Sequence, residues 1–171
     1  MIVERISFFQ KSKNGDIVEK TNAIRLLDRK KVTYKIHTYE GVISGVDVAK
    51  TLGQAPEHVF KTLVCVGKSK KYYVFMIPVA EELCLKKAAS AVGEKSIAML
   101  PQKELLPLTG YIHGGCSPIG MKKQFRTLMH ESATNYETIC FSGGRIGLQI
   151  EANANILQEL IGAETADLVH K

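Results

Sequence analysis

Residues 113–120, with the sequence HGGCSPIG, are the part of the chain best suited to binding a ligand through backbone groups. This segment combines two glycines, a small thiol, a hydroxyl and a proline. Because glycine has no side chain to keep a ligand away, the amides of Gly114 and Gly115 could stabilise a carbonyl oxygen that gains charge. An ordinary turn is the alternative, since glycine and proline are typical of turns.

Lys61 is the second residue whose type and position indicate chemistry. It lies at the start of the apolar run FKTLV, where a strand is expected and a long ammonium side chain is out of place. A buried ammonium is costly without a partner, so Lys61 is predicted to reach a phosphate or a polar substrate group. The alternative is a side chain that extends along the surface to solvent.

Cys116 and His113 are candidates for a nucleophile and its base, because a thiolate next to an imidazole can attack an ester. Residues three apart in a glycine loop need not face each other, and most isolated cysteines are packing residues. The other histidines show no metal-ligand spacing with cysteine or aspartate. We therefore expect no metal site and no cofactor.

Basic residues point to a polyanionic partner. The formal net charge is +6, and lysines that neutralise phosphates gain free energy by releasing counterions. Lys122, Lys123 and Arg126 follow the glycine loop and are the better candidates for contacts with a nucleic-acid backbone. A second group of lysines, in an expected hairpin turn, is as well explained by protection of a sheet edge. The lysines of that group are Lys68, Lys70 and Lys71. The two aromatic residues that follow, Tyr72 and Tyr73, could stack on bases or pack in the core.

These residues need a scaffold, and the hydrophobic pattern predicts a single α+β domain. Short β-rich runs predict strands at residues 34–39, 60–67, 72–79, 110–113, 138–141 and 147–150. Capping residues and glycines predict helices at residues 21–31, 44–52, 85–92 and 153–161. The uneven spacing of the strands argues against a doubly wound parallel sheet, so we expect a compact, mixed, barrel-like sheet surrounded by helices.

Residues 1–20 are predicted to form a separate ribbon or extension, because Asn14-Gly15 is a hairpin turn signal between two short apolar runs. The first apolar run is too short for a signal peptide, and no stretch reaches the roughly 18 apolar residues of a membrane helix. The four cysteines form no close pair and are read as reduced thiols. We therefore expect a cytoplasmic protein with no membrane partner.

Five segments, taken in order, carry a more specific signal: KIHTYE, FKTLV, LKKAA after VFMIPVA, TGYIHGGCSPIG and SGGRIGLQIE. Together they resemble the YbaK-type Cys-tRNA(Pro) deacylases, relatives of the editing domain of bacterial prolyl-tRNA synthetase. The resemblance covers residues 21–171. It implies the mixed α+β fold of that family and a trans-editing hydrolase that removes cysteine from mischarged tRNA(Pro).

The resemblance also implies roles for individual residues. The lysine that the family needs corresponds to Lys61, the pocket tyrosine to Tyr39, and the GxxxP loop to residues 114–118. It further implies that the thiol of the substrate cysteine attacks its own ester, so that the protein supplies no nucleophile. The remaining residues expected to contact the substrate are Cys116, Ser117, Pro118, Ser142 and Gly143.

One position departs from the family. Gln149 stands where members specific for cysteine carry an acidic residue, and an amide binds an ammonium group less strongly than a carboxylate does. A deacylase for another small aminoacyl-tRNA, such as Ala-tRNA(Pro), therefore stays open, as does a non-catalytic module that binds tRNA or a synthetase. The expected partners are mischarged tRNA(Pro) and prolyl-tRNA synthetase, and DNA is not among them.

Overall fold

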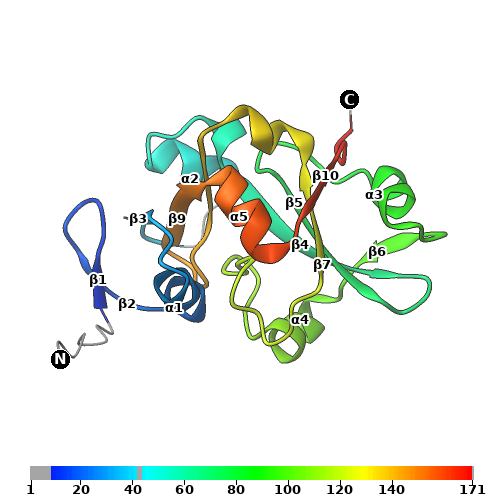
Figure 1. Ribbon diagram of the computed structural model, residues 1–171, viewed down its shortest axis with the longest axis horizontal. Helices are drawn as coiled ribbons and strands as arrows, with labels where there is room; N and C mark the ends of the chain where they lie inside the picture. The colour runs from blue at the N-terminus through cyan, green and yellow to red at the C-terminus, as the bar shows by residue number, and fades with distance from the viewer. Residues whose placement is uncertain (1–8, 42–43, 171) are drawn as a thin grey trace.

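Two β-sheets form the framework of the molecule (Figure 1). The computed structural model describes residues 9–41 and 44–170. In spatial order, the larger sheet contains β10 (Glu164–Ala166), β7 (Arg126–His130), β5 (Tyr72–Pro78), β4 (Phe60–Gly67) and β6 (Ile97–Met99). The smaller sheet contains β3 (Tyr34–Thr38), β9 (Leu148–Asn153) and β8 (Thr138–Ser142).

The larger sheet is mixed, whereas the smaller sheet is antiparallel. β4 runs antiparallel to β5 and β6, while β7 runs parallel to both β5 and β10. A parallel bridge between Val59 and Cys140 joins the two sheets. The structure therefore confirms the predicted mixed α+β fold, in which the main core lies between the two joined sheets.

Side chains from both sheets and from two helices fill the main core. Phe60 of β4, Phe141 of β8 and Ile150 of β9 meet Ile24 and Leu157 there, and all five are almost fully buried. Burying an apolar side chain of this size contributes roughly 1.5 to 3 kcal/mol. This packing fixes the position of β4 relative to β8 and β9.

Five α-helices and two 3-10 segments complete the described chain. The helices are α1 (Asn22–Arg29), α2 (Gly45–Thr51), α3 (Leu85–Val92), α4 (Gln102–Thr109) and α5 (Ala154–Ile161). The 3-10 segments are η1 (Pro56–His58) and η2 (Glu131–Asn135). Thr21, Ser44 and Asn153 cap α1, α2 and α5 through side-chain oxygens that accept backbone N–H bonds, as their residue types predict. No helix in the described residues has the length and the apolar run needed to cross a membrane.

The prediction of a strand at residues 110–113 is wrong. This segment follows α4, which the sequence did not predict because Pro107 lies inside it. Gly110 ends α4 in the left-handed conformation, with φ of 85°. Tyr111 then turns into the core, where its hydroxyl donates to the carbonyl oxygen of Ile119 at 2.7 Å. The glycine loop therefore follows a helix and not a strand.

The Asn14-Gly15 turn lies in a hairpin of β1 (Phe9–Lys11) and β2 (Ile17–Glu19). This hairpin projects from one end of the molecule in Figure 1. A hydrogen bond from the Lys13 amide to the carbonyl oxygen of Ile36, at 2.8 Å, attaches the hairpin to β3. Residues 1–8 of the predicted ribbon lie outside the described residues.

Candidate functional site

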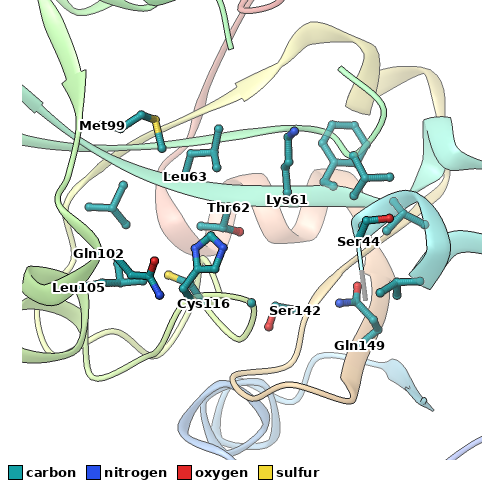
Figure 2. Close-up of a pocket in the computed structure, with 18 of the residues that line it drawn as sticks. Ser44, Lys61, Thr62, Leu63, Met99, Gln102, Leu105, Cys116, Ser142 and Gln149 are labelled. Carbon is teal, nitrogen blue, oxygen red and sulfur yellow. The ribbon is translucent and has the colours of Figure 1, made fainter. Parts of the chain in front are cut away.

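A cavity of about 400 Å³ lies between β4 of the larger sheet and β8 and β9 of the smaller sheet (Figure 2). Parts of α2 and α4, together with the glycine loop, complete its wall. Sites for small molecules usually measure about 300 to 1,000 Å³, so the cavity fits such a ligand or one end of a larger one. The predicted site residues that line it are Tyr39, Lys61, Gly114, Cys116, Ser142 and Gln149.

The cavity runs along a free edge of β4. β6 pairs with Cys65, Val66 and Gly67, so among the described residues the segment 61–64 of β4 pairs with β5 alone. The carbonyl oxygen of Val64 points toward the free edge and accepts from the Leu100 amide at 3.0 Å. Because backbone groups alternate in direction along a strand, Thr62 presents its N–H and C=O toward the same edge. A sheet edge thus offers peptide groups to a ligand.

Lys61 and Thr62 leave β4 on opposite sides in Figure 2, and Thr62 points toward Cys116 and Ser142. Lys61 is half-buried. Burial lowers the pKa of Lys61 below that of an ordinary lysine, and the charges of Glu82 and Glu81 act in the opposite direction. Lys61 is therefore a partly desolvated cation at the cavity wall.

The glycine loop brings backbone to the cavity at close range. Gly114 has φ of 84°, a conformation that favours glycine. A Cβ atom on Gly115 would lie only 2.8 Å from the Cα atom of Arg145, so no side chain fits there. Among the described residues, no backbone oxygen accepts from the amides of Gly114 or Cys116, whereas the Gly115 amide donates to Ile112 at 3.0 Å. The amides available to a ligand are therefore those of Gly114 and Cys116, and the Gly115 amide serves the turn.

Cys116 and His113 both line the cavity, but the structure gives them no hydrogen bond to each other within the described chain. Burial raises the pKa of the Cys116 thiol to about 12. The thiolate is the nucleophilic form of cysteine, so at neutral pH Cys116 is a poor nucleophile. This geometry speaks against a protein thiol as the attacking group.

Gln149 and Ser142 face each other as a cross-strand pair of β9 and β8 at the floor of the cavity. Gln149 is 7% exposed, and its Oε1 atom has no hydrogen-bond partner in the described part of the chain. The Oγ1 atom of Thr62 is likewise buried without such a partner. A buried acceptor without a donor is costly, so both atoms are suited to receive N–H or O–H groups from a ligand.

Several predicted site residues lie behind the cavity wall. Ser117 and Pro118 are buried within the loop, and the amide of Gly143 donates to Leu148 in the turn after β8. They position the residues that line the cavity.

The three basic residues expected to bind tRNA have different surroundings. Arg126 forms a two-point ion pair with Glu164, at 2.7 and 2.9 Å, so its charge is already compensated. The ammonium of Lys122 donates to the carbonyl oxygen of Pro107, at 3.3 Å, near the end of α4. Lys123 is exposed. Only Lys122 and Lys123 keep a charge available to a phosphate group.

Sequence reasoning missed several residues of the cavity. These are Ser44, Thr62, Leu100, Gln102 and Leu105. Thr62 had a signal, since it follows Lys61 inside an apolar strand. Ser44 caps α2, whereas Leu100, Gln102 and Leu105 come from α4 and the segment before it, and the tertiary packing of these helices brings them to the site.

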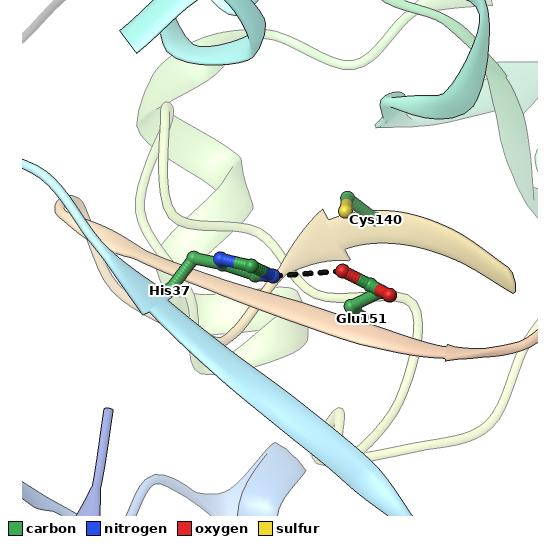
Figure 3. Close-up of side chains that lie close together, drawn as sticks. All are labelled: His37, Cys140 and Glu151. Atoms are coloured by element: carbon green, nitrogen blue, oxygen red, sulfur yellow. Dashed lines mark hydrogen bonds and ion pairs between the residues drawn. The ribbon is translucent and has the colours of Figure 1, made fainter. Parts of the chain in front are cut away.

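A buried polar cluster lies on the same face of the smaller sheet as Gln149 (Figure 3). The Nε2 atom of His37 lies 2.9 Å from the Oε1 atom of Glu151, and the Cys140 thiol lies within 4.8 Å of both side chains. Nitrogen, sulfur and oxygen donors at such distances are a candidate metal set, which sequence spacing did not indicate.

The hydrogen bonds of the cluster favour a structural brace over a metal site. The carboxylate of Glu151 also accepts from Gln54 and Thr138, so both of its oxygens are occupied. Burial and the neighbouring charge of Glu151 raise the pKa of Cys140 to about 12, so its thiol keeps its proton. The cluster ties β3 and β9 together beside the cavity.

Comparison with known proteins agrees with this architecture. A deacylase of Enterococcus faecalis with the provisional name Cys-tRNA(Pro)/Cys-tRNA(Cys) deacylase EbsC is 44% identical over 156 residues, which cover 90% of this chain and 95% of that protein. A crystal structure provisionally described as a trans-editing enzyme for prolyl-tRNA synthetase superposes with a TM-score of 0.78, at 24% identity, over 90% of this chain and 100% of that one. The structure of a hypothetical protein superposes with a TM-score of 0.81, at 20% identity, over 88% of this chain and 100% of that one.

The family match gives the most direct assignment. Residues 40–168 match the aminoacyl-tRNA editing domain, a segment that contains β4, the glycine loop and both strands at the cavity floor. The superposed structures share the same fold over nearly the whole chain. The chain belongs to the aminoacyl-tRNA editing domain family.

Proposed function

We propose that this protein hydrolyses the ester of cysteinyl-tRNA(Pro) in the cavity beside β4, acting in trans and in the cytoplasm. The observation that carries the proposal is one cavity lined by a partly desolvated lysine and by loop amides and buried acceptors that have no hydrogen-bond partner among the described residues. Membership of the editing family and the name of the relative from Enterococcus faecalis support it.

A separate hydrolytic site has a physical reason. Cysteine and proline are similar in size, and an apolar pocket separates near-isosteric groups by only about 1 to 3 kcal/mol. A synthetase that selects proline by shape therefore charges some cysteine. A second site that recognises the thiol can remove that error after release of the tRNA.

The substrate supplies the attacking atom in this scheme. The cysteine sulfur attacks the ester carbonyl carbon, a C–S bond forms, and the C–O bond to the ribose breaks. The ribose oxygen takes the proton that the thiol gave up, and water then opens the cyclic thioester to release cysteine. Effective molarities of about 10⁵ M or more are reached in well-oriented intramolecular reactions. The raised pKa of Cys116 agrees with a reaction that uses no protein thiol.

The glycine loop stabilises the negative charge that develops on the carbonyl oxygen of the ester during attack. The amides of Gly114 and Cys116 are the available donors, and Gly115 allows the close approach of the loop to Arg145. Removal of one such donor typically lowers the rate by about 10² to 10³.

The aminoacyl end is held at the cavity floor. Gln149 and Thr62 offer oxygens to the α-ammonium group of the substrate, and Ser142 and Tyr39 shape the space around it. A neutral amide attracts an ammonium group less than a carboxylate does, so recognition rests mainly on hydrogen bonds. Lys61 holds the ribose or phosphate region of the terminal nucleotide, and Lys122 and Lys123 contact the acceptor stem.

The experiment is a deacylation assay with a panel of charged tRNAs. Cys-tRNA(Pro) and Cys-tRNA(Cys) should be cleaved, whereas Pro-tRNA(Pro), Ala-tRNA(Pro) and Ser-tRNA(Pro) should be stable. The seryl ester is the matched control, because it replaces only the sulfur atom with oxygen. Equal cleavage of the seryl and cysteinyl esters would refute assistance by the substrate thiol. Rapid cleavage of the alanyl ester alone would assign the site to alanine.

A second candidate function is a non-catalytic module that binds charged tRNA or prolyl-tRNA synthetase. Gln149 favours it, because the family resemblance implies an acidic residue at this position and a neutral amide would bind the substrate ammonium group less strongly. Binding of Cys-tRNA(Pro) without cleavage in the same assay would select this alternative. A synthetase that raises the cleavage rate when added would support its role as a partner.

A further inference from the structure

A groove on the far side of α4 adjoins the cavity. Its volume is about 430 Å³, and its walls are Tyr72, Leu100, Pro107 and Leu108. Leu100 lines both the groove and the cavity. Gln102 and Leu105 face the cavity, whereas Lys103 and Glu104 face the groove, so α4 separates the two spaces.

The groove combines an aromatic ring, apolar walls and a charged rim. Tyr72 is half-buried, and its ring packs edge-on against Phe125 at a centroid distance of 5.6 Å. Tyr73, by contrast, is buried on the other side of the sheet, and its hydroxyl donates to Glu94. Within the described residues, Lys103 and Glu104 have no ion pair or side-chain hydrogen bond. They are free to contact a ligand.

We propose that this groove binds the nucleobase that precedes the terminal adenosine of the tRNA, with Tyr72 as its stacking surface. This inference rests on the proposed deacylase function, because an aminoacyl-adenosine in the cavity continues through its 5′ phosphate into the preceding nucleotide. That nucleotide is a cytidine in mature tRNA.

The chemistry of the groove suits a cytidine. Bases stack on aromatic side chains, and the apolar walls from Leu100, Pro107 and Leu108 enclose a flat ring. The carboxylate of Glu104 can accept from the exocyclic amine of cytosine, a pairing that proteins use to read this base. Lys103 can contact the linking phosphate.

Substrates of increasing length test the proposal. The assay compares cysteinyl-adenosine, the cysteinyl ester of cytidylyl-adenosine, and the same dinucleotide with an abasic ribose in place of the cytidine. The wild-type protein should cleave the cytidine-containing ester with the highest kcat/KM. Stacking of one base contributes about 1 to 3 kcal/mol, so its preference over the abasic ester should be about 5- to 150-fold.

Variants then assign the preference to Tyr72. In Tyr72→Ala, kcat/KM for the cytidine ester should become nearly equal to kcat/KM for the abasic ester. Tyr72→Phe should keep the wild-type preference for the cytidine ester. Leu106→Ala is the matched control, since Leu106 is exposed on α4 and lines neither space. Because the abasic substrate tests the wild-type protein, the result does not depend on the folding of any variant.

The outcomes separate the two proposals. Equal kcat/KM for the cytidine and abasic esters in the wild-type protein would overturn the groove proposal while the deacylase remained. An unchanged ratio in Tyr72→Ala would also overturn it. Failure to cleave any cysteinyl ester would instead overturn the deacylase proposal, and the groove proposal would fall with it.

Discussion

Lys61 and the glycine loop both line the cavity beside β4, with the Lys61 side chain on the opposite side of the strand from Thr62. The cation is partly desolvated, and two amides of the loop lack an acceptor in the described chain. At the scale of the residue, the described part of the site thus contains the charge of Lys61, two amide donors and unpartnered acceptors, and its cysteine is not activated as a nucleophile. Such a site orients and stabilises a substrate that carries its own reactive group.

Cys116 tests this division of roles. Burial raises the pKa of its thiol to about 12, so the thiol is protonated at neutral pH. Cys116→Ser should keep the rate of cysteine release from Cys-tRNA(Pro) within about threefold of the wild-type rate, because it keeps the backbone amide. The assay is single-turnover deacylation with excess protein. Loss of more than a hundredfold in a folded variant would show that the protein thiol takes part.

The pH profile tests Lys61. Burial lowers the pKa of Lys61. Its ammonium form is present below this pKa and is lost as pH rises through it. This loss should occur at lower pH than in a free lysine, whose pKa is about 10.4. Catalysis that needs the ammonium should therefore fall on the alkaline side of the profile, after subtraction of the rate in buffer. Glu82→Gln removes a charge that supports the ammonium and should move this alkaline limb to lower pH.

Glu159→Gln, on the exposed face of α5, is the control for the loss of one carboxylate. It should leave the alkaline limb in place. An identical shift in both variants would show that the profile reports net charge and not Lys61.

At the scale of the element, the helices with capping residues and closing glycines could be predicted from the sequence, as could the long strands. α1 has a capping residue at its start, α3 has a closing glycine and α5 has both, while β4 and β5 are long, mainly apolar runs. α4 was missed because Pro107 interrupts the helical pattern. β6, β7 and β10 are short and acquire strand structure only by pairing with neighbours distant in sequence.

The same distinction applies to the site. Lys61, Tyr39 and the loop were found through motifs, but Gln102 and Leu105 depend on how α4 packs, which no local pattern reveals. The assignment of the Gly115 amide was also beyond the sequence, because its bond to Ile112 is a property of the turn. The domain boundary at residue 20 stays a prediction.

Substitution in the loop tests the role of this element. In Gly115→Ala the new Cβ atom would meet backbone atoms of Arg145 and Ile146 at 2.8 to 2.9 Å, and backbone cannot move aside cheaply. The loop should shift and kcat should fall by about 100- to 1,000-fold, as for the loss of an oxyanion donor. The measurement is single-turnover deacylation, with folding checked by circular dichroism.

Gly162→Ala is the matched control for that loop variant. Gly162 ends α5 with φ of 62°, and a Cβ atom there meets nothing within 4 Å. This variant should lose some stability from backbone strain but keep the wild-type kcat. A Gly115→Ala variant with unchanged kcat would remove the loop from the catalytic account.

At the scale of the whole molecule, the two sheets must hold a fixed relation, because the cavity lies between them. The main core and the Val59–Cys140 bridge provide this, and the hydrogen bond between His37 and Glu151 braces the smaller sheet beside the cavity. Stability and activity should therefore depend on different residues.

Glu151→Gln tests the brace. Burial acts to raise the pKa of Glu151, but the hydrogen bond and charge of His37 outweigh it, so the pKa lies below the ordinary value. The ionised Glu151 therefore stabilises the folded state above its unfolded-state pKa of about 4.3, and this stabilisation is lost as pH falls through its folded-state pKa. The variant should lose about 1 to 3 kcal/mol of unfolding free energy at pH 7, and this difference should narrow in acid.

Urea unfolding at a series of pH values measures this effect. Thr134→Ala, which removes an exposed hydroxyl from η2, is the control and should show no such pH dependence. A constant difference between wild type and Glu151→Gln across the acid range would contradict the role of the charge.

The most direct test of the central claim is single-turnover release of cysteine from Cys-tRNA(Pro), with wild-type protein and Lys61→Ala compared with buffer alone. The wild-type protein should release cysteine rapidly, and the folded Lys61→Ala variant should release it at a rate near that in buffer. Release by the wild-type protein at the buffer rate would contradict the assignment of this cavity as a deacylase site.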